Sequence, residues 1–414
     1  MTTRTRSLAA AVLVAVIGLA TASSEAAGVP APKAFSEAGL KAKLGGLVAQ
    51  AAPGTGVYVF DPQIGDGRVL FADGSDERRI LASNTKLFTT STALDRLGPD
   101  TRLVTRVWAD GPVTAGTLDG SLYLVGDGDP TFGRSEVEAL AQQVKNAGIA
   151  HVTGKVLVDD TIFDRRRGLG KNPNTPNPYV GPLSGLSYEF GLAGHGFSDK
   201  PEIDAGTAFR EELEDHGIGV GGEIDYGKAS ASLQASEPIA SVSSEPIGEL
   251  VEQTNEPSNN FFAEMLLKRL AAEPGEPGTT RSGAQIVRAY ARRLGTRVRV
   301  KDGSGIGRKD QTSAEHVGEL LVAMLDEPTE EPFYESLPRA GIEGTLSNRM
   351  EGTAAEGRCR AKTGTINAVS ALSGYCELAD GPVAFSILMN GVGNVTAARG
   401  LQDRMVVAIA QYQR

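Results

Sequence analysis

The chain is 414 residues long and acidic, with a formal net charge of −10 and 22% charged residues. This length leaves room for two or three domains. The acidic balance argues against binding to nucleic acid or to an anionic lipid surface, because both are negatively charged. Beyond the N-terminal segment no stretch approaches about 18 uninterrupted apolar residues, so we expect no transmembrane anchor in the mature form.

The N-terminal segment has the layout of a secretory signal. Arg4 and Arg6 precede an uncharged apolar run over residues 7–22, and small residues follow it, including Ala26 and Ala27. The run is shorter than the roughly 20 residues that a membrane-spanning helix needs. We therefore predict a cleaved signal peptide over residues 1–27 and an extracytoplasmic, secreted protein.

The periodicity of the remaining chain predicts helices and strands in a mixed order. Before residue 100 it predicts a helix over 34–51, a hairpin of strands 56–61 and 68–71, and a helix from Ser83 to a stop at Gly98-Pro99. The middle of the chain predicts a small α/β unit, with strands 121–125, 152–158 and 222–226, helices 135–147 and 202–218, and a Gly/Asn/Pro-rich loop over 168–182. The C-terminal part predicts helices 247–253, 260–270, 282–294 and 402–412, and strands 298–302, 361–365, 371–378 and 383–389.

Three short motifs carry chemistry. The first is Ser83-Asn-Thr-Lys86 at a helix start, where an i, i+3 pair places the amine within reach of the hydroxyl. A serine is a weak nucleophile until a base takes its proton, and a lysine can do so when its pKa is lowered. Taken alone, the pattern is as typical of a solvated helix start as of a catalytic site.

The second motif is Ser258-Asn-Asn260, which follows Pro257 and precedes an apolar helix. Taken singly, a serine in this position is more often a helix N-cap than a catalytic residue. The third is Lys362-Thr363-Gly364-Thr365 on a strand, where the glycine would admit a substrate backbone. A lone Lys-Thr-Gly is common, but the three motifs in this order and context are specific to penicillin-binding proteins and class A β-lactamases.

The mature chain resembles the S13 family, the class C low-molecular-mass penicillin-binding proteins that are D-Ala-D-Ala carboxypeptidases and endopeptidases. Besides the three motifs, the segments similar to that family are 124–130, 156–163, 302–305, 341–346 and 372–375. The resemblance implies an α/β (α+β) fold with a β-lactamase-like transpeptidase domain over 28–106 and 246–414, and a smaller inserted α/β domain over 107–245. The separation of Ser83 from Ser258 is too long for a β-lactamase and short for the family, so we expect a further nested domain to be reduced or missing.

The resemblance also implies the roles of the site residues. Ser83 would attack the carbonyl of the penultimate D-Ala, with Lys86 as general base and backbone N–H groups of Ser83 and Thr365 as the oxyanion hole. Ser258 would relay a proton to the leaving amine, within a network held by Lys362, and Asn260 would bind the peptide carbonyl. Thr363 and Thr365 would hold the terminal carboxylate, with Lys362 adding positive charge. Expected ligands are peptidoglycan peptides and β-lactams.

Family members carry a pocket for the side chain of the third stem-peptide residue. Arg308 resembles its cationic member and Tyr179 its aromatic wall, while Asn174 stands where an acidic residue is expected. A solvated arginine is the alternative interpretation of Arg308. No cofactor or metal is expected, because the histidines lack ligand spacing: His151, His195, His216 and His316.

Two other functions share parts of this pattern. One is a β-lactamase, which would need a Glu-x-x-Leu-Asn loop, and the sequence lacks this loop. The other is a non-catalytic penicillin-binding cell-wall sensor, and the intact Ser83, Lys86 and Lys362 argue against it.

Cys359 and Cys376 are the only cysteines. If the two C-terminal strands turn between Asn367 and Ala368, the cysteines lie equally far from the turn and face one another. We therefore predict a disulfide beside the third motif, with two buried free thiols as the alternative.

Overall fold

A five-stranded antiparallel sheet carries the third motif. The computed structural model describes residues 34–170, 172–273 and 275–414, so the predicted signal peptide lies outside the described residues. The strand order is β16-β17-β18-β1-β2, which makes β16 an edge strand. The strands are β1 (Gly54–Asp61), β2 (Arg68–Asp73), β16 (Cys359–Ile366), β17 (Val369–Leu378) and β18 (Gly381–Asn390). Because β1 pairs with β18, segments from both ends of the described chain build one sheet.

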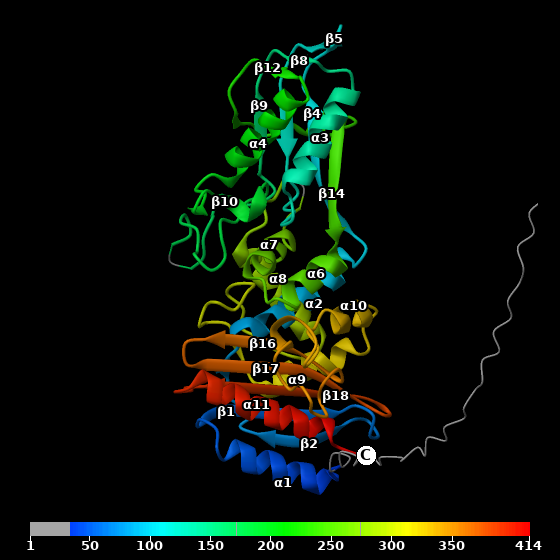
Figure 1. Ribbon diagram of the computed structural model, residues 1–414, viewed down its shortest axis with the longest axis vertical. Coiled ribbons are helices and arrows are strands. Elements are labelled where there is room, and N and C mark those ends of the chain that lie inside the picture. Colours follow the sequence, from blue (N-terminus) through cyan, green and yellow to red (C-terminus); the bar gives the residue numbers. More distant parts are fainter. Residues whose placement is uncertain (1–33, 171, 274) are drawn as a thin grey trace, which may run out of the picture. The chain divides into compact units, whose positions relative to one another are not determined.

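Helices cover both faces of this sheet. Successive strand residues point to opposite faces, so Val57 and Val59 pack in one hydrophobic core while Tyr58 packs in another. The first core includes α1 (Glu37–Val48) and α11 (Val395–Ala410), which Figure 1 shows in blue and red beside the sheet. The second core lies among α2 (Thr85–Leu97), α6 (Ile247–Asn255), α7 (Asn260–Arg269), α8 (Thr280–Arg293), α9 (Ala314–Met324) and α10 (Glu330–Glu335).

The middle of the chain forms a second five-stranded sheet in the order β13-β9-β7-β4-β14. Its strands are β4 (Arg102–Ala109), β7 (Leu122–Val125), β9 (Val156–Asp159), β13 (Asp225–Tyr226) and β14 (Ala240–Pro246). The chain passes through α3 (Arg134–Asn146) between the parallel strands β7 and β9, which confirms the β-α-β order expected here. Side chains of α3 and of α4 (Pro201–Asp215) fill the core of this region.

Shorter elements complete the described chain. A four-stranded sheet contains β5 (Val113–Thr114), β6 (Thr117–Leu118), β8 (His151–Val152) and β12 (Gly219–Val220). Two pairs of short strands are β3 (Arg79–Ile80) with β15 (Gln311–Thr312), and β10 (Leu192–Ala193) with β11 (Gly196–Phe197). A one-turn helix, α5, spans Ala231–Gln234. Among the described helices none has the length and apolarity to cross a membrane.

Three predicted strands are wrong in part. The segment 298–302 makes only an isolated bridge at Arg299, because the backbone N–H groups of Lys301 and Asp302 donate to the Asp310 carboxylate instead of to a strand. The predicted strand 152–158 is two strands, β8 and β9, that belong to different sheets, and 222–226 contains only the short β13. The periodicity of the sequence did not predict β4, β14, α9 and α10.

The predicted disulfide is present. Cys359 and Cys376 are directly opposed in the β16–β17 pair and are bonded, with their Cα atoms 4.0 Å apart. The ladder continues to Ile366 opposite Val369, so the turn centres where the equal spacing of the cysteines placed it.

Candidate active site

Ser83 lies in a single 3₁₀ turn, Ala82–Asn84, directly before α2. Lys86, in the first turn of α2, points back toward it, with Nζ 3.1 Å from Ser83 Oγ. The ammonium group also donates to Asn260 Oδ1 at 2.7 Å and to the Ser304 carbonyl at 2.9 Å. These three acceptors fix the amine beside the hydroxyl.

Burial changes the chemistry of Lys86. Its side chain is fully buried, and loss of hydration lowers the pKa of the amine to about 7, against the opposing attraction of Glu264 and Asp302. An amine with this pKa is neutral in a large fraction of molecules near neutral pH. The neutral amine can accept the proton of Ser83.

Three buried carboxyl groups lie behind Lys86. Glu264 Oε1 accepts hydrogen bonds from Gly303 N–H, Ser304 N–H and Ser304 Oγ at 2.6–2.9 Å, and so fixes the loop whose carbonyl binds Lys86. Asp302 accepts hydrogen bonds from Gly305 N–H and Gly307 N–H, and Asp310 accepts from Lys301 N–H and Asp302 N–H. Burial and the neighbouring charge of Asp302 raise the pKa of Asp310 to about 9, so the Asp310 carboxyl is protonated at neutral pH.

The third motif lies on β16, beside the 3₁₀ turn. Asn84 joins the two elements: its Nδ2 donates to the Lys362 carbonyl at 2.7 Å, and its Oδ1 accepts from Ser373 of β17 at 2.8 Å. A Cβ at Gly364 would lie 2.9 Å from the Leu81 carbonyl oxygen and 3.0 Å from Ser83 N. The glycine therefore allows β16 to approach the Ser83 turn, a reason that the sequence did not reveal.

Lys362 is fully buried, and burial together with the charge of Lys86 holds the pKa of its amine well below the ordinary value. Its Nζ donates to the Thr363 carbonyl at 3.2 Å. Thr363 Oγ1 donates to Thr345, and Thr365 Oγ1 accepts from Arg399 Nη2 at 3.0 Å.

The second motif lies at the start of α7. Asn260 contacts Lys86 through Oδ1, and its Nδ2 donates to the Tyr179 carbonyl at 3.0 Å. Asn259 caps the helix, so the interpretation of Ser258 as the cap is wrong. Ser258 has a positive φ of 64°, a strained backbone conformation for a residue with a side chain. No side-chain hydrogen bond joins Ser258 to Ser83 or Lys362 among the described residues.

A pocket of about 470 Å³ opens over Ser83. Its lining is Ser83, Tyr179, Asn260, Ile306, Arg308, Thr365, Ile366 and Asn367. Arg308 Nη1 donates to the Asn367 carbonyl at 2.7 Å, and the Tyr179 side chain is 74% exposed. The structure thus brings five predicted site residues to one pocket and places Lys86 and Lys362 buried beside it, while Ser258, Thr363 and Gly364 are outside the lining.

The sequence motifs did not point to all the residues around Ser83. Asn84 stands inside the first motif but was not assigned a role. Ser304 contacts Lys86 through its backbone carbonyl, which no side-chain pattern can reveal. Glu264 had a visible signal: it is a charge in an apolar helix, four residues after Asn260 and therefore on the same helix face.

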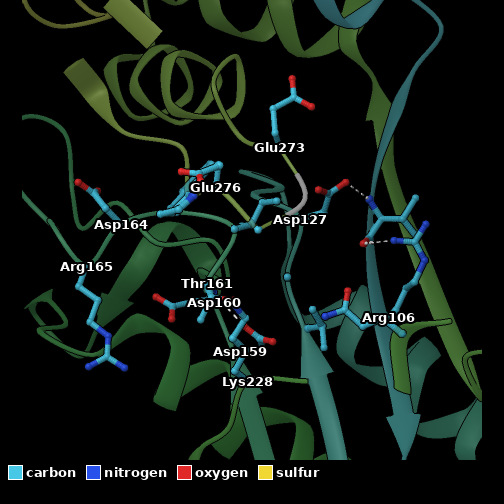
Figure 2. A pocket seen from close by; sticks show the side chains of 18 of the residues that line it. Arg106, Asp127, Asp159, Asp160, Thr161, Asp164, Arg165, Lys228, Glu273 and Glu276 are labelled. Atoms are coloured by element: carbon cyan, nitrogen blue, oxygen red, sulfur yellow. Dashed lines mark hydrogen bonds between the residues drawn. The ribbon is translucent and has the colours of Figure 1, made fainter. Parts of the chain in front are cut away.

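A second pocket, of about 370 Å³, lies away from Ser83 and is rich in acidic side chains (Figure 2). Several of those carboxylates already have cationic or polar partners: Asp127 with Arg269, Asp159 with Thr161, Asp160 with Arg167 and Asp164 with Lys268. We therefore interpret these four carboxylates as structural. In the part of the chain that the structure describes, no cluster of His, Cys, Asp and Glu has an arrangement that could hold a metal ion.

Comparisons with known proteins agree with this geometry. A D-alanyl-D-alanine carboxypeptidase from Actinomadura sp. (strain R39) is 31% identical over 441 residues, which cover 86% of this chain and 81% of the relative. The crystal structure of penicillin-binding protein 4 from Haemophilus influenzae has the same fold, with a TM-score of 0.76 at 20% identity over 90% of this chain and 99% of that one. A predatory endopeptidase from Bdellovibrio bacteriovorus, acylated by penicillin G, gives a TM-score of 0.55 at 19% identity over 84% and 90% of the two chains.

The match to a family model covers nearly all of the described residues. The model of the D-Ala-D-Ala carboxypeptidase 3 (S13) family matches residues 40–193 and 195–412. This match includes all three motifs and the strands and helices that bring them together. The chain therefore belongs to the D-Ala-D-Ala carboxypeptidase 3 (S13) family.

Proposed function

We propose that this protein is a serine-type D-Ala-D-Ala carboxypeptidase and endopeptidase that acts on peptidoglycan stem peptides through an acyl-enzyme and is acylated by penicillin. The observation that carries the proposal is the pair of Ser83 Oγ and the buried Lys86 Nζ, 3.1 Å apart at the floor of a pocket. A buried amine with a pKa of about 7 can act as a base at neutral pH.

In the first step, neutral Lys86 takes the proton of Ser83 while Oγ forms a bond to the carbonyl carbon of the penultimate D-Ala. The tetrahedral intermediate then collapses, and the C–N bond breaks. The proton passes from Lys86 to the leaving D-Ala amine, with Ser258 as the relay. In the second step, water attacks the ester carbonyl, the Ser83 oxygen leaves and recovers a proton, and the shortened peptide is released.

Strand register supports an oxyanion hole at Ser83 N–H and Thr365 N–H. Ala361 N–H and the Cys359 carbonyl point away from β17, since they bond to Pro338 and Ala340. Backbone groups of alternate residues point to the same side of a strand, so those of Thr363 and Thr365 also point outward, to the pocket side. Each donor of this kind contributes about 3–4 kcal/mol to transition-state binding.

The remaining motif residues would bind and orient the peptide. Asn260, fixed between Lys86 and the Tyr179 carbonyl, would bind a peptide carbonyl. Lys362 would form a hydrogen-bond network with Ser258 around the bound peptide, and Thr363 and Thr365 would hold the terminal carboxylate. Arg308 and Tyr179, on the pocket wall, would bind the side chain of the third stem-peptide residue.

Labelling with a fluorescent penicillin tests the proposal. A stable label together with release of D-Ala from stem peptides supports the peptidase, rapid turnover of the label would mean a β-lactamase, and no label would mean a binding protein. Ser83→Ala should remove both labelling and D-Ala release while circular dichroism remains unchanged. Acylation at a different serine, found by peptide mapping, would contradict the assignment of Ser83.

We also propose that the protein acts outside the cytoplasm, in association with the cell wall, after removal of residues 1–27. The Cys359–Cys376 disulfide supports this location, because such bonds persist in oxidising compartments. N-terminal sequencing of the protein from culture fluid or the cell envelope tests the cleavage. An intact N-terminus on the exported protein would contradict it.

A further inference from the structure

Arg399 of α11 reaches across to the end of β16. Its Nη2 donates to Thr365 Oγ1 at 3.0 Å, and the residue is exposed. Arg399 forms no ion pair with an acidic residue of the described chain, and its only side-chain hydrogen bond there is the one to Thr365. An exposed guanidinium without an acidic partner, fixed at a hydroxyl on the rim of the Ser83 pocket, is free to bind an anion.

Strand alternation explains why α11 supplies this group. The side chains of Cys359 and Ala361 pack in the core that α11 shares, so Thr363 and Thr365 project from the same face of β16. Lys362 points to the opposite face, toward Lys86. Two side chains of the third motif therefore stand on the side from which Arg399 approaches.

The hydrogen bond also orients the Thr365 hydroxyl. A guanidinium can only donate, so Thr365 Oγ1 accepts from Arg399 and keeps its own proton for another acceptor. The guanidinium and the Thr365 hydroxyl are therefore two neighbouring donors. A carboxylate is the acceptor that fits such a pair, because guanidinium groups bind carboxylates through two parallel hydrogen bonds.

We propose that Arg399 binds the terminal carboxylate of the leaving residue, together with Thr365, and thereby selects substrates with a free C-terminal acid. This inference rests on the proposed function. The other cations near the pocket are less suited to the role. Lys362 is fully buried, and Arg308 donates to the Asn367 carbonyl.

A pair of substrates that differ only in this charge tests the proposal. Second-order acylation rate constants are measured with benzylpenicillin and with its methyl ester, which lacks the negative charge, for the wild type and for Arg399→Ala. We expect the preference for the acid over the ester to fall roughly 10- to 100-fold in the variant, the effect of losing a charge-assisted hydrogen bond. Arg399→Lys should keep part of the preference, because it keeps the charge.

Arg404→Ala is the matched control. Arg404 lies on the same helix, is exposed, and contacts Gln50. Its removal should leave the acid-to-ester preference at the wild-type value. Equal losses on acid and ester in Arg399→Ala would overturn the inference and assign Arg399 to holding β16, and an unchanged preference would also overturn it. Failure of the wild type to react with either penicillin would instead overturn the proposed function, and the inference with it.

Discussion

Lys86 sets the pH dependence that we expect for the reaction. The amine is the base in its neutral form, which predominates above its pKa of about 7. The second-order rate constant for penicillin acylation should therefore rise with pH through an inflection near pH 7 and reach a plateau at higher pH, as measured by stopped-flow quenching or label incorporation. A profile that is flat from pH 5.5 to 8.5 would contradict a lysine base.

Glu264→Gln should move that profile to lower pH. The carboxylate of Glu264 raises the pKa of Lys86, so its removal leaves the unopposed effect of burial and lowers that pKa further. Glutamine keeps an oxygen acceptor for the Gly303 and Ser304 N–H groups. A merely structural role would reduce the rate at all pH values without moving the inflection, and this is the result that would contradict the prediction.

Arg308→Ala should reduce selectivity for natural peptides. If Arg308 binds the third stem-peptide side chain, the ratio of kcat/KM on stem peptides to the penicillin acylation rate should fall on the order of 10- to 100-fold. A simple penicillin lacks the group that Arg308 would bind. Equal losses on the two substrates would show that Arg308 supports the cleft through its hydrogen bond to Asn367.

The motif residues could be predicted from the sequence because their order and spacing are specific. The groups that hold the motif residues in place could not be predicted. Ser304 binds Lys86 through a backbone carbonyl, and Asn84 acts by joining a turn to a strand that follows 278 residues later. Contacts of this kind depend on how distant segments pack, and no local pattern encodes them.

The β16–β17 hairpin is the element whose stability is simplest to test. The disulfide closes a loop of about 16 residues, for which chain entropy gives roughly 3 kcal/mol. A Cys359→Ala/Cys376→Ala variant should lose about this much free energy of unfolding in urea titrations. Reduction of the wild type with dithiothreitol under unfolding conditions should give the same loss. An unchanged midpoint in both experiments would mean that the bond is energetically neutral.

The hairpin also shows why some elements were predictable. The segments 361–365, 371–378 and 383–389 were predicted as strands, and each is part of a longer observed strand. The segment 298–302 was also predicted as a strand, but its Lys301 and Asp302 N–H groups donate to the Asp310 carboxylate. A tertiary hydrogen bond thus replaced a strand that the local pattern favoured.

At the scale of the whole molecule, Lys268 joins α7 to the segment that leads from β9 to the loop 168–182. Its fully buried amine donates to the Asp164 and Arg166 carbonyls and lies 2.7 Å from Asp164 Oδ1. Lys268→Met should lower the free energy of unfolding by about 3–5 kcal/mol, because removing one partner leaves buried polar groups without hydrogen bonds.

Lys41→Met is the control for that prediction. Lys41 pairs with Glu37 on an exposed helix face, and its loss should change stability by less than about 1 kcal/mol. Similar effects of the two substitutions in thermal and urea unfolding would contradict a structural role for Lys268.

The division into a catalytic domain and an insertion over 107–245 stays a prediction. Strand β4 runs through the first boundary of this insertion, and β14 runs through the second.

The edge of β16 has a consequence for how copies of the protein meet. An open sheet edge can pair with the edge of another copy, and this is a common start of aggregation. Here residues 338–340 cover the first half of β16, so the uncovered part is short. Two exposed cations, Arg308 and Arg399, flank its far end. Pairing of two copies along this part of β16 would place their arginines close together. The repulsion between these like charges disfavours self-association at the edge beside the Ser83 pocket.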